Sequence, residues 1–91
     1  MKIIFLMFSI IIPTLNNLNY LKICIESIKK NSVYNHDIIV HVNEGLDGTI
    51  DFLKNNNIKY TYSESNVGLC SAVNQASKKS TYEYIIYAHD D

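Results

Sequence analysis

Apolar residues along this chain fall into short runs that alternate with amphipathic segments. The runs are rich in Ile, Val and Tyr and have the length of β-strands, whereas the segments between them repeat apolar residues every three or four positions, as helices with one buried face do. The predicted strands run from Met7 or Phe8 to Ile12, Asp37 to Val42, Ile58 to Tyr62 and Glu83 to Tyr87, and the predicted helices from Leu18 to Asn31, Ile50 to Asn55 and Leu69 to Lys78.

Strand, helix and strand units of this length connect with a right-handed crossover into a parallel sheet. We therefore expect an α/β fold: a Rossmann-like, three-layer arrangement with a mainly parallel four-stranded sheet flanked by three helices. The carboxyl ends of parallel strands share one edge of the sheet, and ligands of doubly wound sheets bind there. Polar residues follow each predicted strand, so we expect them to frame one cleft.

The chain has 91 residues, which predicts a single domain, 1–91, with residues 1–6 as a short apolar extension. The first apolar run is too short to span a bilayer and runs into Pro13 without a small-residue cleavage site, so we expect a cytoplasmic protein. Contact of Ile3 to Leu6 with a membrane surface is the lesser alternative. The formal charge is -1 and the lysines are scattered, so nothing favours nucleic acid as a partner.

Two cysteines, Cys24 and Cys70, lie in predicted helices without CxxC spacing. This spacing indicates reduced thiols rather than a disulfide or a zinc site. Cys70 follows Gly68 near a predicted helix start, where a thiolate would be stabilised. A small buried side chain is nevertheless the favoured interpretation of Cys70.

The last predicted strand is followed by two adjacent acids, Asp90 and Asp91. Adjacent carboxylates at the tip of a buried strand repel each other and lose hydration, which favours a bound divalent cation or a hydroxyl-bearing ligand. The chain contains neither GxGxxG nor GxxxxGK[ST], so a phosphate would need another source of positive charge. Mg²⁺ or Mn²⁺ on this pair would supply it. Taken alone, Asp90 and Asp91 could instead be solvated residues at the end of the sequence, with no bound ligand.

Four segments in this order and spacing resemble the N-terminal half of a family 2 glycosyltransferase with the GT-A fold. The resemblance covers nearly the whole chain, from about Phe8 to Asp91. The segments are Ser9 to Asn16, Ile38 to Thr49, Asn66 to Ala76 and Tyr87 to Asp91.

The resemblance implies a nucleotide-diphosphate sugar as donor, with a UDP-sugar the commonest choice, a divalent metal, Mn²⁺ or Mg²⁺, and a glycan or other hydroxyl acceptor. Asn43 occupies the position of an Asp that accepts a hydrogen bond from the base, Asp90 that of a ribose contact and Asp91 that of the metal ligand. The resemblance also implies that Asp47 or Thr49 caps the helix after Gly48. The implied nucleotide-sugar residues are Pro13, Thr14, Asn16, Asn43, Asn66, Gly68 and Asp90.

The general base of this family lies well beyond the acidic motif, so no catalytic residue is assigned to the chain, and we expect it to carry the donor half of the enzyme. A non-catalytic nucleotide-binding remnant or stand-alone binding module is the alternative. A receiver-like domain ranks lower because it would place acids after the first strand. The last strand would leave an exposed sheet edge, through which the chain could self-associate.

Overall fold

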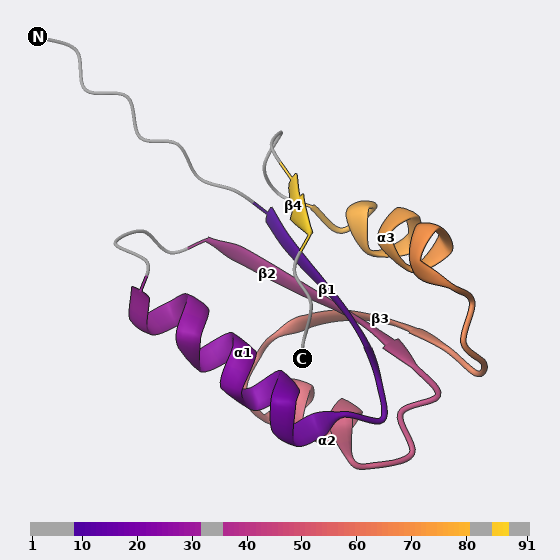
Figure 1. The fold of residues 1–91 in the computed structure, drawn as a ribbon, viewed down its shortest axis with the longest axis horizontal. Coiled ribbons are helices and arrows are strands. Elements are labelled where there is room, and N and C mark those ends of the chain that lie inside the picture. Colours follow the sequence, from indigo (N-terminus) through magenta and orange to yellow (C-terminus); the bar gives the residue numbers. More distant parts are fainter. Residues whose placement is uncertain (1–8, 32–35, 81–84, 88–91) are drawn as a thin grey trace, which may run out of the picture.

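The computed structural model describes residues 9–31, 36–80 and 85–87 and shows strands and helices in strict alternation (Figure 1). The predicted α/β class, with a parallel sheet and three helices, is confirmed, and the arrangement is consistent with a Rossmann-like fold. In chain order the elements are β1 (Ser9–Leu15), α1 (Leu18–Asn31), β2 (Asp37–Asn43), α2 (Thr49–Asn55), β3 (Lys59–Ser63), α3 (Leu69–Ser77) and β4 (Ile85–Tyr87).

The sheet has the strand order β3-β2-β1-β4, and its paired strands run parallel. β1 pairs with β2 along its full length, from Ser9 opposite Asp37 to Leu15 opposite Asn43. The three residues of β4 pair with Ser9 to Ile11, so the described part of β4 covers only the first half of β1. Since all strands share one direction, the carboxyl ends of β1, β2 and β3 meet at one edge.

β1 extends to Leu15, three residues further than the sequence predicted, and Pro13 and Thr14 lie inside the strand. Proline is usually excluded from strand interiors because it cannot donate a ladder hydrogen bond. Pro13 lies opposite His41 of β2, and the described pairing of β1 with β4 covers Ser9 to Ile11. The extension carries Thr14 to the level of Val42 at the carboxyl edge.

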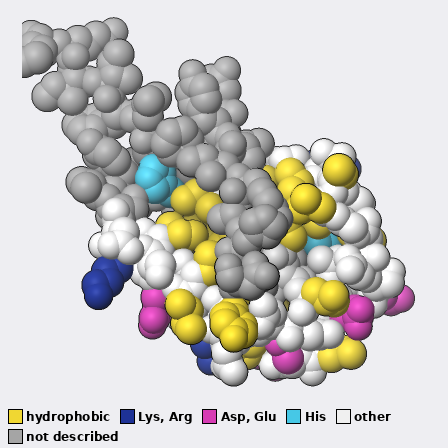
Figure 2. Space-filling view, viewed as in Figure 1, with side chains coloured by type: hydrophobic (Ala, Val, Ile, Leu, Met, Phe, Trp, Pro, Cys, Tyr) yellow, Lys and Arg dark blue, Asp and Glu magenta, His cyan; other side chains and the backbone are white. Residues whose placement is uncertain are grey.

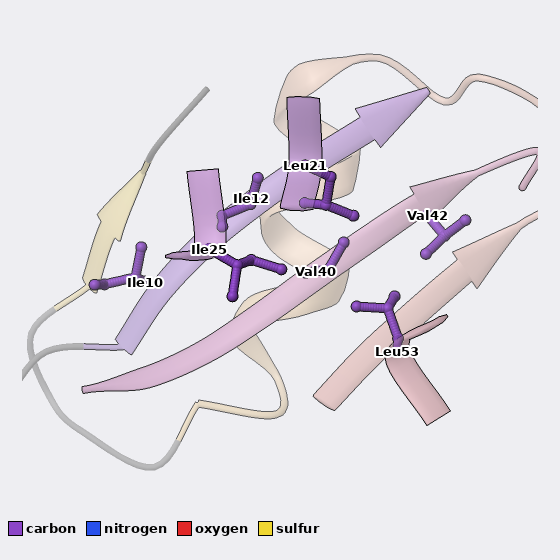
Figure 3. Packing of buried hydrophobic residues seen from close by; sticks show 7 residues of the cluster. All are labelled: Ile10, Ile12, Leu21, Ile25, Val40, Val42 and Leu53. Atoms are coloured by element: carbon purple, nitrogen blue, oxygen red, sulfur yellow. The ribbon is translucent and has the colours of Figure 1, made fainter. Parts of the chain in front are cut away.

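One face of the sheet packs against α1 and α2 through an apolar core. Side chains of alternate residues on β1 and β2 point towards Leu21 and Ile25 of α1 and Leu53 of α2 (Figure 3). Alternation places these strand residues on a single face of the sheet. The buried members of this cluster are Ile10, Ile12, Leu21, Ile25, Val40, Val42 and Leu53.

The opposite face packs against α3 through a smaller apolar cluster formed by Ile11, Ile39 and Ala76. Ala72 and Ala76 are fully buried and let the helix approach β1 and β2. Leu69, the first residue of the helix, is 50% exposed. Cys70 is also exposed rather than buried, and Cys24 and Cys70 form no disulfide bond with each other.

Charged side chains are dispersed over the described surface and do not gather into a patch on the face seen in Figure 2. The one ion pair among the described residues joins Lys59 Nζ to Asp37 Oδ1 at 3.1 Å, at the amino-terminal edge of the sheet. None of the helices in residues 9–31, 36–80 and 85–87 has the length and apolar character needed to cross a membrane.

Candidate functional site

A pocket of about 310 Å³ opens at the carboxyl edge of the sheet, where β1 and β2 end and α3 begins. It brings together five of the residues that the sequence predicted for a nucleotide-sugar site, although they come from three separate segments. The lining residues are Pro13, Thr14, Leu15, Asn17, Asn43, Asn66, Gly68 and Leu69.

Asn43, the last residue of β2, lines this pocket and connects three neighbouring segments. Its Nδ2 donates a hydrogen bond to the carbonyl oxygen of Thr14 at 3.2 Å, and its Oδ1 accepts one from the backbone N–H of Val67, also at 3.2 Å. The Ser63 hydroxyl lies 3.1 Å from the same Oδ1. The side chain is only 5% exposed. It therefore joins the end of β1, the end of β3 and the loop that leads to α3.

Asn66 and Gly68 shape the start of α3. The Oδ1 atom of Asn66 accepts a hydrogen bond from the Gly68 N–H at 3.0 Å, in the local turn that Asn commonly forms. Gly68 has a φ of 83°, which an L-residue with a side chain rarely adopts. A Cβ built there would meet nothing within 4 Å, so the conformation and not the space favours glycine.

Asn16 does not line this pocket. Its Oδ1 accepts a hydrogen bond from the Leu46 N–H at 2.7 Å, which ties the end of β1 to the loop after β2. Its neighbour Asn17 lines the pocket in its place. That Asn16 contacts a nucleotide stays a prediction, and its Oδ1 already binds the Leu46 N–H within the chain.

Asp47 holds the loop after β2 against α1. Its Oδ2 accepts a hydrogen bond from the Leu18 N–H at 2.8 Å, and its Oδ1 accepts one from the Thr49 hydroxyl. Asp47 therefore caps α1 rather than α2, contrary to the sequence prediction; Gly48 occupies the N-cap position of α2 and makes no side-chain cap. Burial alone would raise the pKa of Asp47, but these hydrogen bonds outweigh it and lower that pKa.

His41 was not predicted as part of the site, yet it lies two residues before Asn43 on the face that α3 covers. Its Nδ1 lies 2.7 Å from the Thr61 hydroxyl and its Nε2 lies 3.1 Å from the Ser63 hydroxyl. Burial lowers the pKa of His41, and the neighbouring Asn43 amide offsets this only in part. The alternation of β2 residues could have placed His41 beside Asn43, but only the sheet register identifies its partners on β3.

Two leucines at the pocket, Leu15 and Leu69, were not predicted either. They are 42% and 50% exposed, which is high for large apolar side chains. Both line the pocket, so part of its wall is apolar. An aromatic base or the face of a sugar ring could pack against such a wall.

The acids that the sequence assigned to the ribose and the metal, Asp90 and Asp91, lie outside the described residues. Tyr87, the last described residue of β4, is level with Ile11 on β1, and the two strands run in the same direction. Within 9–31, 36–80 and 85–87, no group of three or more His, Cys, Asp or Glu side chains is placed to hold a metal ion.

The family model described as "Glycosyl transferase family 2" matches residues 9–91. The match includes every element of the sheet, the whole pocket and the terminal acids. No curated protein matches the chain.

Proposed function

Because this chain belongs to glycosyl transferase family 2, we propose that its carboxyl-edge pocket binds a nucleotide-diphosphate sugar together with a divalent metal. UDP-sugar is the proposed donor, and the transfer goes to an acceptor hydroxyl. The observation that carries this proposal is the convergence of Pro13, Thr14, Asn43, Asn66 and Gly68 on one pocket. These residues come from three separate segments of the sequence: the end of β1, the end of β2 and the loop that leads into α3.

The electrostatics of the pocket support a requirement for a metal. All eight described lining residues are uncharged. A diphosphate carries at least two negative charges, and removing them from water without a counter-charge is costly. A divalent cation held by hard oxygen ligands would provide that counter-charge. Asp91 is the proposed ligand, and Asp90 is the proposed hydrogen-bond acceptor for the ribose.

The proposed division of labour follows from the residue types. The apolar side chains of Leu15 and Leu69 shield one side of the pocket from water. The loop from Asn66 to Gly68 presents backbone groups at the first turn of α3. The metal stabilises the leaving nucleotide diphosphate when it is bound. The general base that activates the acceptor hydroxyl is not assigned to any residue of this chain.

The binding of UDP in the presence and absence of Mn²⁺, measured by isothermal titration calorimetry, tests this proposal. We expect binding that depends on Mn²⁺ and that weakens at least about tenfold in Asp91→Asn, since a charged metal ligand is replaced by a neutral one. Asp51→Asn is the matched control, because Asp51 is exposed in the first turn of α2 and outside the pocket. It should bind like wild type.

The two arms of the experiment separate the metal site from the pocket. Equal UDP affinity with and without Mn²⁺, and equal affinity in Asp91→Asn, would overturn the metal assignment. Failure of UDP to bind under any condition would overturn the choice of uridine. A parallel titration with GDP and CDP would then show whether the pocket takes another nucleotide.

A further inference from the structure

Asn43 joins the ends of β1 and β3 to the loop that leads to α3, and we infer that it is a positioning residue whose neutral amide sets the shape of the pocket. This role differs from the one that the resemblance implies, in which the residue at this position accepts a hydrogen bond from the base. The inference deepens the proposed function but rests on it only for the identity of the ligand. The hydrogen bonds of Asn43 are independent of any ligand.

Two backbone groups fix the orientation of the Asn43 amide. The Thr14 carbonyl oxygen can only accept a hydrogen bond, and the Val67 N–H can only donate one. Nδ2 of Asn43 faces the Thr14 carbonyl oxygen, and Oδ1 faces the Val67 N–H. The side chain at this position must therefore carry a hydrogen-bond donor at one terminal atom and an acceptor at the other. An Asn side chain satisfies both, whereas an ionised Asp offers two acceptors and would face the Thr14 carbonyl with a negative charge.

The same contacts limit what Asn43 can offer a ligand. Its Oδ1 already receives the Val67 N–H and lies within hydrogen-bond distance of the Ser63 hydroxyl. The second N–H of Nδ2 has no acceptor among the described residues, so Asn43 presents a donor to the pocket. The Ser63 hydroxyl has a single proton and also lies 2.8 Å from the Ser65 carbonyl oxygen, so Asn43 Oδ1 and that carbonyl oxygen compete for it.

Few titratable groups of the described residues surround this position. β1 and α3 carry no charged side chain, and the Cys70 thiol of α3 is exposed. On the same face of the sheet, His41 contacts the Ser63 hydroxyl that Asn43 also approaches. The chain neighbour Glu44 donates its backbone N–H to the Ser63 carbonyl. Lys59 of β3 lies at the opposite edge, paired with Asp37.

The test is Asn43→Asp, with thermal unfolding followed at pH 4.5 and pH 8. A buried carboxyl group facing a carbonyl oxygen has a raised pKa in the folded state, so its stability is present at low pH and is lost as the pH rises. A protonated Asp can donate to Thr14 and accept from Val67, as the amide does. We expect Tm to fall on the order of 10 °C relative to wild type at pH 8 and much less at pH 4.5.

Two controls make this result specific. Asn66→Asp is the same chemical change in the same pocket, but Asn66 only accepts, from the Gly68 N–H, so a carboxylate serves equally well and no loss at pH 8 is expected. Asn43→Ala removes both arms of the amide, so its loss should be similar at both pH values. Protection of the Val67 amide from hydrogen exchange should fall in Asn43→Asp at pH 8 and return at pH 4.5.

A ligand measurement distinguishes this inference from the proposed function. UDP with Mn²⁺ should bind Asn43→Asp more weakly at pH 8 than it binds wild type or the control Asp51→Asn, whose substitution lies outside the pocket. If wild type binds UDP but Asn43→Asp is as stable as wild type at pH 8, or as unstable as Asn43→Ala at pH 4.5, the positioning role is overturned and the proposed function stands. If wild type does not bind UDP while the stability pattern holds, the proposed function fails and the role of Asn43 stands.

Discussion

The two faces of the sheet differ in what they bury. The face towards α1 and α2 buries a continuous set of Ile, Leu and Val side chains. The face towards α3 buries a small apolar cluster and, nearer the carboxyl edge, the side chains of His41 and Asn43, which contact the partly buried Thr61 and Ser63. Adjacent residues of β2 therefore serve different purposes: Val40 and Val42 contribute to the apolar core, and His41 and Asn43 organise the pocket.

The two faces of the sheet contribute differently to stability and to the geometry of the site. Burial of apolar surface is non-directional and supplies most of the stability. A buried hydrogen-bond network contributes less net free energy but requires specific partners, so it fixes geometry. The α1 and α2 face should accordingly tolerate changes that conserve volume, and the α3 face should respond mainly to changes in donors and acceptors.

The largest expected effect is on the apolar face. Leu21→Ala removes a fully buried side chain from the core and should lower the free energy of unfolding by about 2–5 kcal/mol. Ile23→Ala lies two residues away on the same helix and is 59% exposed, so it should change stability by about 0.5 kcal/mol or less. Urea denaturation followed by circular dichroism measures both. Equal losses would mean that the core was assigned to the wrong face of α1.

A nearly isosteric pair compares the two faces directly. Val40→Thr places a hydroxyl in the apolar cluster, where it lacks a partner, and should cost about 1–3 kcal/mol. Thr61→Val makes the reverse change on the polar face and removes the hydroxyl next to His41 Nδ1. Thr61 is only partly buried, so this change should cost less, about 0.5–1.5 kcal/mol. The opposite ranking in urea denaturation would contradict the division between the faces.

A smaller effect is expected where the loop after β2 joins α1. Asp47→Asn replaces a charged acceptor of the Leu18 N–H and the Thr49 hydroxyl with a weaker one, at a cost of about 1 kcal/mol. The folded-state pKa of Asp47 is below its usual value of 3.8, so its stabilisation is present above that value and is lost as the pH falls through the folded-state pKa.

Denaturation midpoints of wild type and Asp47→Asn between pH 2.5 and 7 measure the stabilisation that the Asp47 carboxylate provides. The difference between the two proteins should shrink towards the acid end of the series. Glu26→Gln, an exposed acid on α1, is the control and should run parallel to wild type. A constant difference between wild type and Asp47→Asn across the series would show that the charge of Asp47 is not what caps α1.

The smallest effect concerns the charge of His41. Its folded-state pKa lies below the usual value of 6.5, so the unfolded chain takes up the proton first and stability falls as the pH drops from about 6.5. His41→Gln should flatten this part of the pH profile while lowering stability throughout. Urea midpoints at pH 7.5, 6.5 and 5.5 measure how stability changes with pH. An equal change in wild type and His41→Gln would show that protonation of His41 does not cause it.

The sequence predicted the elements well because the periodic signals were strong. α1 begins at Leu18 as predicted, and β2 begins at Asp37. The end of β1 was misplaced because Pro13 is a strong strand-breaking signal in a sequence. The sequence alone could not show that β1 continues past Pro13 in register with β2, to Leu15 opposite Asn43.

The site was predicted as a set of residues but not as a set of contacts. Asn43 and Thr14 were placed at the same edge because parallel strands end there, and they meet at 3.2 Å. The partners of His41 and the helix that Asp47 caps depend on the register of β3 and on a contact between residues 29 positions apart. Local sequence patterns carry no information about such pairs.

The most direct test of the proposed pocket is an NMR titration of the ¹⁵N-labelled chain with UDP and Mg²⁺. We expect the largest amide shifts at Thr14, Asn43 and Gly68, which line the pocket at the carboxyl edge. Amides at the opposite edge, such as Lys29 and Ile58, should remain unchanged and serve as the internal reference. Shifts that concentrate at Lys29 and Ile58 while the pocket residues stay fixed would contradict a nucleotide-sugar site at this edge of the sheet.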